Sequence, residues 1–349
     1  MKDNRLTIIF DNAPSSHKEG IIERLALDSD ILLFHISNAN DYFHPSRQYL
    51  KKLSFPSNRY ILDSKSEVKE IKNSISNIVL KYQKTIEKYK SIKIIYSFID
   101  FKRLFLVLFL YRQISKLSDN ISNVSYLEPI RFNDFKVLFR LVKITTSLIF
   151  QRYVLSTKTI YLTSSLNSFF YKLFFRNFLI FPYKQTTGYI KNCKTILKVP
   201  ISSKYKILFI GQLITRKNPL LLLKACKKLT FPVDLTILGK GKLKEKIIKN
   251  IHKIKKKDLN VDFIDSFDNE NIHKIIKSND VLVLPSKFDG FGFVVAEAIY
   301  CNTFAIVSSN VGSKDLIKSG KNGSIFINNS LEDLINHLNL HYLKKKFHE

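Results

Sequence analysis

The sequence has few cysteines and no long apolar run. Cys193, Cys226 and Cys301 are too scattered for a disulfide framework, and no Cys-x-x-Cys pair indicates a metal site. The longest apolar run, 104–111, is far short of the roughly 20 residues that a membrane-spanning helix needs. The segment 1–14 has too short an apolar stretch for a secretory signal. We therefore expect a cytoplasmic protein without a disulfide framework, which attaches to a membrane, if at all, only at its surface.

Acidic residues are scarce relative to basic ones. The 349 residues include 57 Lys and Arg against 29 Asp and Glu, which gives a formal net charge of +28. Such a surplus attracts nucleic acids, anionic lipid headgroups or phosphorylated substrates, although a biased codon pool would produce much of the same excess. The sequence contains no recognisable nucleic-acid-binding module, and its basic residues are spread along the chain. We therefore expect no nucleic-acid partner and keep a nucleic-acid-binding protein only as an alternative.

Glycine is rare, with 10 residues in 349, so its placement is informative. Eight of the glycines stand at or after position 211, at the end of an expected strand or in a loop or turn that follows one. A sequence that avoids glycine keeps it where the backbone needs a positive φ or where a ligand approaches the main chain closely. We therefore expect a binding site in the strand-end loops of the second half of the chain.

The second half alternates short apolar strands with helical segments. The expected strands are 205–211, 233–239, 261–265, 280–286 and 303–309. Strands that alternate with helices through short loops predict a doubly wound parallel sheet. In such a sheet, ligands bind at the carboxyl ends of the strands.

The first half shows the same alternation less regularly. Its candidate strands are 6–10, 31–36, 92–98 and 159–163. Length and pattern together predict two α/β domains. We place the N-terminal domain at 1–190, the C-terminal domain at 191–330, and a C-terminal helix, which we expect to cross back to the first domain, at 331–349.

The loop 211–218 has residues that suit an anionic ligand. Gly211 closes a strand, and the cations Arg216 and Lys217 come just before a helix. Loop amides, a helix N-terminus and two cations together favour a phosphate or diphosphate, whereas the simpler interpretation is a solvated basic turn. The loop is not a Gly-x-x-x-x-Gly-Lys phosphate loop, and the chain contains no Gly-x-Gly-x-x-Gly motif.

A second loop, 285–298, reads PSKFDGFGFVVAEA. Asp289 precedes an expected helix start, and Glu297 lies one to two turns inside that helix. Gly290 and Gly292 permit a tight turn and leave the nearby amides uncovered for a diphosphate or an oxyanion. The two carboxylates suit a hydroxyl-rich ligand, because each oxygen accepts a hydrogen bond. The alternatives are a helix-capping role for Asp289 and a solvated position for Glu297.

These two loops resemble the signature of family-4 glycosyltransferases with the GT-B fold. That signature has an acid, Gly-Phe-Gly, a Glu eight residues after the first acid, then a glycine, an acid and a Gly-x-Asn-Gly turn. The matching residues are Asp289, Gly290, Phe291, Gly292, Glu297, Gly312, Asp315, Gly320, Asn322 and Gly323. The segment 209–225 resembles the family's Gly-Arg-Leu-x-x-x-Lys loop, and 235–247 resembles its Leu-x-x-x-Gly-x-Gly-x-x-Leu element. In the first of these, Gln212 replaces the usual Arg and Asn218 the usual Gly.

The resemblance implies two Rossmann-like domains facing a cleft. It implies transfer of a sugar from a nucleotide-diphosphate donor, UDP- or GDP-sugar, with retention of anomeric configuration and with no required metal or other cofactor. It implies that Glu297 holds the ribose, that Lys217 holds the diphosphate, and that Asp289 meets the donor sugar. The other donor-site residues that we expect are Gly211, Gln212, Ser266, Phe267, Gly290, Phe291, Gly292 and Phe293. We expect Arg216 to supply the cation that Gln212 lacks, and we expect Asp289, Lys217 and Arg216 to be the catalytic residues.

The acceptor side is less defined. In the first domain, the segment after strand 6–10 places His17 and Gly20 toward the expected cleft. Basic, aromatic helical segments at 101–116, 135–152 and 169–181 predict either contact with an anionic membrane or core helices with a solvated basic face.

Membrane contact would make the acceptor a lipid-linked glycan, a lipopolysaccharide or a capsular polysaccharide. It would also make the protein peripheral at the inner face of the plasma membrane. A catalytically silent transferase-like subunit is the remaining alternative, because Gln212 removes one cation.

Overall fold

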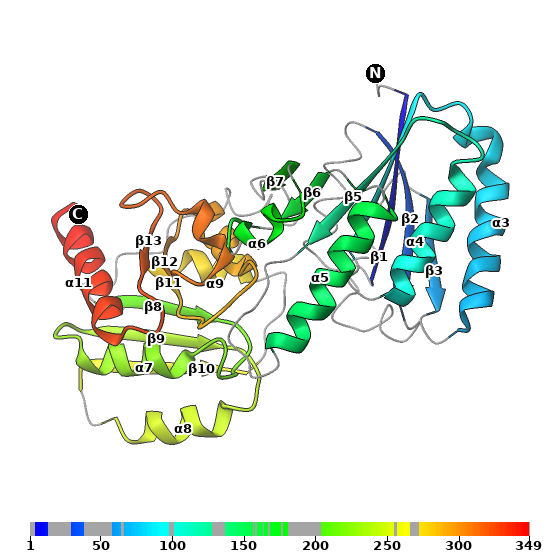
Figure 1. The fold of residues 1–349 in the computed structure, drawn as a ribbon. Helices are drawn as coiled ribbons and strands as arrows, with labels where there is room; N and C mark the ends of the chain where they lie inside the picture. The colour runs from blue at the N-terminus through cyan, green and yellow to red at the C-terminus, as the bar shows by residue number, and fades with distance from the viewer. Residues whose placement is uncertain are drawn as a thin grey trace. The chain divides into compact units, whose positions relative to one another are not determined.

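The chain consists of two compact α/β units. The computed structural model describes residues 4–12, 29–37, 58–63, 66–97, 101–127, 137–155, 157, 159–162, 164–166, 168–175, 177–180, 204–254, 257–265 and 272–348. The N-terminal unit comprises Met1–Thr163 and Asn167–Thr187, and the C-terminal unit comprises Ser164–Leu166 and Gly188–Glu349. Each unit is built on one parallel sheet flanked by helices, which confirms the predicted α/β class (Figure 1).

The N-terminal unit contains a seven-stranded sheet of order β3-β2-β1-β4-β5-β6-β7, in which every pairing is parallel. Its strands are β1 (Arg5–Asn12), β2 (Asp30–Ser37), β3 (Asn58–Asp63), β4 (Ser91–Tyr96), β5 (Ile121–Leu127), β6 (Thr159–Leu162) and β7 (Asn177–Ile180). Its helices are α3 (Val68–Ile86), α4 (Phe101–Ile114), α5 (Val137–Tyr153) and α6 (Ser168–Lys172).

Apolar residues at helical spacing explain how α3 attaches to this sheet. Ile71, Ile75 and Val79 recur every four residues and are buried in one core with Ile8 of β1 and Ile94 of β4. Helix α4 contributes to the same core, whereas α5 and α6 share a second core with β6.

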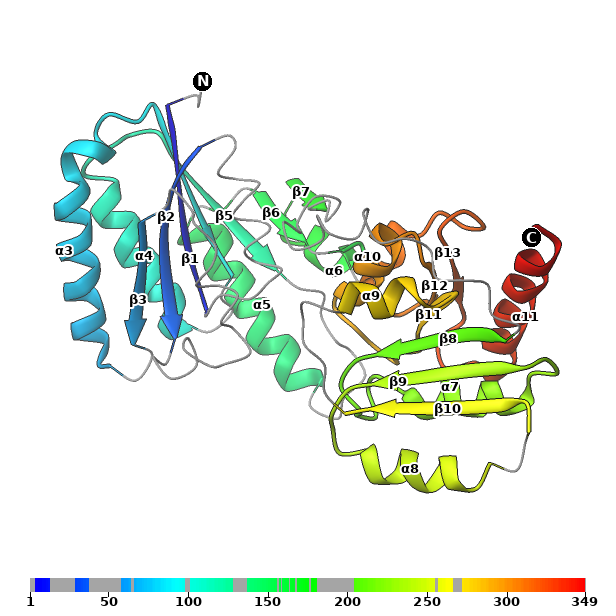
Figure 2. The same cartoon turned by 180° about the vertical axis from the view of Figure 1, so that it is seen from behind.

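The C-terminal unit contains a six-stranded parallel sheet of order β10-β9-β8-β11-β12-β13 (Figure 2). Its strands are β8 (Tyr205–Ile210), β9 (Val233–Leu238), β10 (Leu259–Ile264), β11 (Val281–Leu284), β12 (Phe304–Ser308) and β13 (Gly323–Phe326). Its helices are α7 (Pro219–Lys228), α8 (Lys244–His252), α9 (Ile272–Lys277), α10 (Phe293–Tyr300), the 3-10 helix η5 (Gly312–Leu316) and α11 (Leu331–His348).

Strand β8 shows why this sheet is covered on both faces. Successive side chains of a strand point to opposite sides. Ile207 and Phe209 are buried in the core that α7, α8 and α11 cover, whereas Leu208 and Ile210 are buried in the core under α9 and α10. The strand order reverses between β8 and β11, and ligands bind at such a point in open α/β sheets.

The C-terminal helix α11 packs on its own unit. Leu334 and Leu338 are fully buried in the core shared with α7. The Tyr205 hydroxyl lies 2.5 Å from Nδ1 of His341, and Lys345 forms a 2.8 Å ion pair with Asp280. The expectation that 331–349 crosses back to the first domain stays a prediction, as do the predicted domain boundaries.

Two further observations bear on the sequence-based expectations. Cys226 is buried and is not disulfide-bonded, whereas Cys301 is disulfide-bonded, a bond that the cysteine spacing did not indicate. In the part of the chain that the structure describes, no helix combines the length and the apolar character needed to cross a bilayer.

Candidate functional site

The loops at the carboxyl ends of β8, β9 and β10 are tied together by main-chain hydrogen bonds. The amide of Gly211 donates to the carbonyl of Leu238 (3.0 Å), and the amide of Leu213 donates to that of Lys240 (2.8 Å). The amide of Gly239 donates to the carbonyl of Ile264 (3.0 Å). The loop 211–218 is therefore fixed by its neighbours before any ligand is considered.

One glycine of this region serves close backbone packing. A Cβ atom built on Gly239 would lie 2.0 Å from the carbonyl oxygen of Gly211, a distance that no side chain can occupy. This glycine is therefore needed to let two strand-end loops touch, and sequence reasoning did not separate that role from ligand approach.

Asp289 is the centre of a cluster of three charged side chains. The Lys217 ammonium donates a hydrogen bond to Oδ2 of Asp289, and Nη1 of Arg216 lies 3.7 Å from its Oδ1. Nη1 of Arg216 also donates to the carbonyl of Phe288 (3.0 Å). The side chains of Asp289 and Lys217 are only 12% and 14% exposed. The structure thus brings together, from two loops 72 residues apart, the three residues predicted to be catalytic.

The main chain of Asp289 is held on both sides. Its amide donates to the carbonyl of Asn310 (3.0 Å), and its carbonyl accepts from the amide of Gly312 (2.9 Å). The loop that carries the cations is attached to the same segment, because the amide of Lys287 donates to the carbonyl of Arg216 (2.8 Å). Acid and cations are therefore fixed relative to one another.

Helix α10 begins directly after this cluster. Gly292 occupies the N-cap position with φ of 84°, which disfavours any residue with a Cβ. A Cβ there would also lie 2.7 Å from Cδ2 of Leu284 and 3.0 Å from Cγ1 of Val311. Because Gly292 is the N-cap and Asp289 is in ion pairs, the alternative of Asp289 as a helix cap is wrong. A glycine N-cap supplies no side-chain acceptor to the first amides of the helix.

Glu297 lies on α10 in apolar surroundings. Val295 and Ala298 beside it are fully buried, and burial raises the pKa of the Glu297 carboxyl from 4.5 to about 7. No hydrogen-bond or ion-pair partner of this carboxylate occurs within the described ranges. A fully solvated position is therefore excluded, and the carboxylate is available to a polar ligand.

The structure describes only some of the other predicted site residues. The side chain of Gln212 is exposed, and Phe291 is buried with its ring centroid 4.8 Å from that of Phe293. Ser266, Phe267, His17 and Gly20 lie outside the described residues.

Sequence reasoning missed Asn310, which supports the cluster. Its carbonyl accepts from the Asp289 amide, and its Nδ2 donates to the carbonyl of Lys287 (3.3 Å). Its place just after β12 was the available signal, because strand-end loops of a parallel sheet meet at one edge.

Sequence reasoning also missed the buried hydroxyls of Ser286 and Ser313, which have no hydrogen-bond partner among the residues that the structure describes. Among the described residues, no three His, Cys, Asp or Glu side chains are close enough together to hold a metal ion, and the expected metal independence stays a prediction.

Comparison with known proteins links this geometry to one family. Residues 196–349 match the family model described as glycosyl transferases group 1. Two curated relatives from Campylobacter jejuni are α-N-acetylgalactosaminyltransferases whose names include undecaprenol-linked saccharides. One is 34% identical over 122 residues, and the other is 29% identical over 127 residues. The matches cover 34% and 35% of this chain, and they span about a third (33%) of the length of each relative.

Solved structures resemble the whole chain. The lipopolysaccharide outer core galactosyltransferase WaaB superposes with a TM-score of 0.65 at 16% identity, covering 98% of this chain and 91% of WaaB. HepE from Anabaena in complex with UDP superposes with a TM-score of 0.65 at 13% identity, covering 99% of this chain and 91% of HepE. Residues 196–349, which contain the Asp289 cluster, thus match the glycosyl transferases group 1 model, and the solved structures show that the chain has the GT-B fold.

Proposed function

We propose that this protein is a glycosyltransferase that moves a sugar from a nucleotide-diphosphate sugar to a glycan acceptor. The observation that carries the proposal is the convergence of Lys217, Arg216 and the N-terminus of α10 at the carboxyl ends of β8 and β11. Two cations beside a helix N-terminus suit a diphosphate group.

The chemistry that we assign to this site is electrostatic. Transfer breaks the bond between the anomeric carbon and the diphosphate oxygen, forms a bond from that carbon to an acceptor hydroxyl oxygen, and passes the proton of that hydroxyl to the departing diphosphate. Negative charge then develops on the departing diphosphate, where Lys217 and Arg216 stabilise it. We further propose retention of anomeric configuration and no requirement for a metal ion, as the family resemblance implies.

Recognition of the donor sugar and of the ribose would use two carboxylates, Asp289 and Glu297. Asp289 accepts hydrogen bonds from the donor sugar, and Glu297 accepts them from the ribose hydroxyls. The half-buried position of Glu297 supports this assignment, since a buried carboxylate needs hydrogen-bond donors. The donor class that we propose is a UDP- or GDP-sugar, because structures of HepE are described with UDP and with UDP-glucose.

The acceptor that we propose is a lipid-linked glycan or a lipopolysaccharide. Support comes from the relatives, since two are named for undecaprenol-linked saccharides and WaaB for the lipopolysaccharide outer core. A role in making a surface polysaccharide, capsule included, follows from the same class of acceptor.

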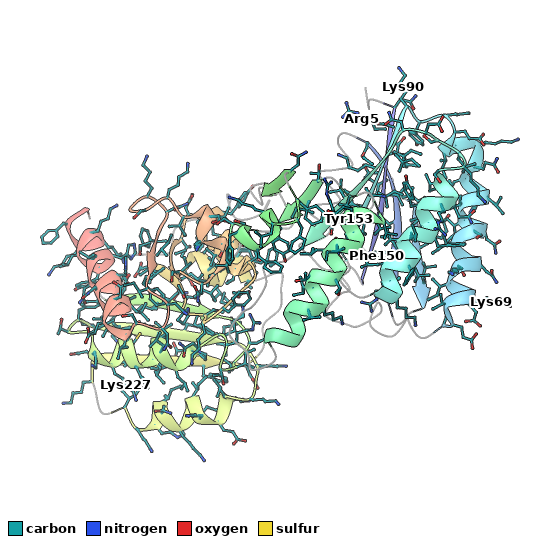
Figure 3. All side chains as sticks on the ribbon, in the orientation of Figure 1. Arg5, Lys69, Lys90, Phe150, Tyr153 and Lys227 are labelled. Atoms are coloured by element: carbon teal, nitrogen blue, oxygen red, sulfur yellow. The ribbon has the colours of Figure 1, made fainter. Side chains whose placement is uncertain are left out.

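We also propose that the N-terminal unit contacts an anionic membrane. Helix α5 exposes Val142 (56%), Ile149 (43%) and Tyr153 (77%), which share one helix face at spacings of seven and four residues. Figure 3 labels Phe150 and Tyr153 on the last turns of this helix, and Phe150 packs against the half-exposed Phe105 of α4 (ring centroids 5.3 Å apart). We call Val142, Ile149, Tyr153 and Phe105 the α5 face.

The two helices that carry the α5 face, α4 and α5, contain basic residues and no Asp or Glu. Lys143 of α5 is exposed, and no Asp or Glu occurs between Asp134 and Asp234. Apolar side chains beside cations, without acids, suit the interface of an anionic bilayer. The proposed location is therefore the inner, cytoplasmic face of the plasma membrane.

The test of the transferase proposal is a thermal-shift screen with UDP-, GDP-, ADP- and CMP-sugars, because a bound donor raises stability. The donor that shifts the melting temperature is then incubated with lipid-linked glycan acceptors in the presence of EDTA, and the anomeric configuration of the product is read by NMR. Absence of any shift and of any transfer would contradict the proposal. An inverted product would contradict only the proposed retention, and loss of activity in EDTA only the proposed metal independence.

One observation favours a second candidate, a catalytically silent subunit. Gln212 stands where the family has an arginine, so the loop has one cation fewer at that position. Donor binding without transfer or donor hydrolysis would identify this case.

A further inference from the structure

Both cations that we assign to the diphosphate are already paired with one carboxylate. Lys217 donates to Oδ2 of Asp289, and Arg216 faces Oδ1 at 3.7 Å. A diphosphate that binds these cations therefore comes close to a carboxylate of its own sign.

Asp289 cannot easily move away from an incoming anion. Its amide and its carbonyl are both hydrogen-bonded, to Asn310 and Gly312, and its side chain is only 12% exposed. The main chains of Arg216 and Lys287 are joined as well. Like charges in a partly buried site repel much more strongly than in water, because the local dielectric constant is lower.

The donor and the product differ in what they offer this carboxylate. An intact nucleotide sugar brings hydroxyl groups that can donate hydrogen bonds to Asp289 and offset the repulsion. A nucleoside diphosphate brings its charge to the same place without those hydroxyls.

We propose that Asp289 makes the site discriminate between nucleotide sugar and nucleoside diphosphate, and so favours release of the product. This inference rests on the proposed function, since it assumes a diphosphate at the Lys217 and Arg216 pair. Asp289 then competes with the product for the two cations, and it is satisfied by the sugar only before transfer.

The opposing possibility is that Asp289 helps binding by holding Lys217 in place. The two cases predict opposite signs for one substitution. Asp289→Asn removes the charge and keeps the size, so competition predicts tighter binding of the product, whereas positioning predicts weaker binding.

The experiment is isothermal titration calorimetry with UDP and GDP on the full-length protein. We expect Asp289→Asn to bind the preferred diphosphate about tenfold more tightly than the unmodified protein, by removal of one nearby like charge. Asp289→Ser serves as a second neutral variant in case Asp289→Asn folds poorly, and Asp289→Glu, which keeps the charge, should bind as weakly as the unmodified protein.

Two controls separate this effect from a structural one. Asp280→Asn removes a carboxylate that is paired with Lys345 at the opposite end of β11 (2.8 Å), and it should leave diphosphate affinity unchanged. In a Lys217→Ala background, the increase in diphosphate affinity caused by Asp289→Asn should be smaller, because one of the two cations that both Asp289 and the diphosphate bind has been removed.

The outcomes are distinguishable. Binding of UDP or GDP to the unmodified protein with unchanged or weaker binding to both neutral variants overturns the inference alone. No binding of either nucleotide to the unmodified protein, together with no thermal shift by any nucleotide sugar, overturns the proposed function and the inference with it.

Discussion

The two units share a strand order but use it differently. In each sheet, the second and third strands are added one after the other on one side of the first strand. The fourth strand then pairs with the first strand on its other side, as in β3-β2-β1-β4 and β10-β9-β8-β11. In the C-terminal unit, the strand-end loops are joined by main-chain hydrogen bonds and carry the Asp289 cluster. In the N-terminal unit, the described residues expose the apolar α5 face in a part of the sequence that lacks acids. One topology thus carries a fixed polar site in one unit and an exposed apolar surface in the other.

The largest effect that we expect is loss of transfer on Lys217→Ala. Removal of a preorganised cation from a departing diphosphate should lower kcat/KM by roughly a hundredfold or more. Steady-state kinetics measures it, with circular dichroism to confirm folding. The matched control is Lys227→Ala on α7, whose ammonium donates to the carbonyl of Asn250 (3.2 Å) and not to the cluster. Equal losses from both variants would show that the C-terminal unit holds no localised cation site.

The next effect tests how closely the main chain of the C-terminal loops packs against neighbouring side chains. Gly292→Ala places a Cβ against Leu284 and Val311 at a positive φ, which should destabilise the protein by about 2–4 kcal/mol through overpacking and backbone strain. Gly320→Ala has a comparable φ of 73° but nothing within 4 Å of its Cβ, so about 1 kcal/mol is expected. Urea denaturation compares the two variants, and a smaller loss at Gly292 than at Gly320 would refute the packing around α10.

The third effect is the change in the stability of the protein with pH, which we attribute to Glu297. Between pH 4.5 and about 7, the folded protein keeps a proton on Glu297 that the unfolded chain has released, so stability falls as the pH rises through this window. Glu297→Gln cannot ionise, and its melting temperature should exceed that of the unmodified protein by a margin that grows, to a few degrees, from pH 5 to pH 8.

The same variant should bind its nucleotide sugar about tenfold more weakly, since a charged acceptor of hydrogen bonds is lost. A melting-temperature difference that is constant with pH would mean that Glu297 is not desolvated. Unchanged donor affinity would remove its proposed contact with the ribose.

The smallest effect on stability, and the sharpest contrast between the units, is expected at the α5 face. The double variant Ile149→Ser and Tyr153→Ser changes exposed side chains, so the free energy of unfolding should move by only about 0.5 kcal/mol per substitution. Its sedimentation with vesicles of anionic lipid should fall severalfold, whereas donor affinity stays the same. Leu340→Ser on α11 removes another exposed apolar residue (64%) and is the matched control. Equal vesicle binding by all three proteins would remove the support for membrane contact.

Much of the C-terminal unit was predictable from sequence because its strands are short, apolar and separated by glycine-marked loops. The loops that meet at Asp289 could be paired in advance, since parallel strands place their carboxyl ends at one edge. The ion pairs within that cluster could not be predicted, because they depend on side-chain rotamers and on a loop position set by Asn310 and Gly312.

The N-terminal unit was harder to predict for a physical reason. Its helices α4 and α5 are apolar around much of their circumference, so periodicity alone could not separate a buried face from an exposed one. Val142 and Ile149 are exposed while Ile144 and Leu148 of the same helix are buried. Residues of the same chemical type thus occupy opposite environments, and only packing decides between them.

The contact between Gly239 and Gly211 also bears on how such chains diverge in sequence. A position where any Cβ would overlap a carbonyl oxygen tolerates no ordinary substitution, however freely the surrounding residues drift. The family model matches residues 196–349, which include this contact, whereas solved structures superpose on nearly the whole chain. A backbone-to-backbone contact of this kind ties one residue type to the fold itself, so we expect these glycines to persist where the side chains around them change.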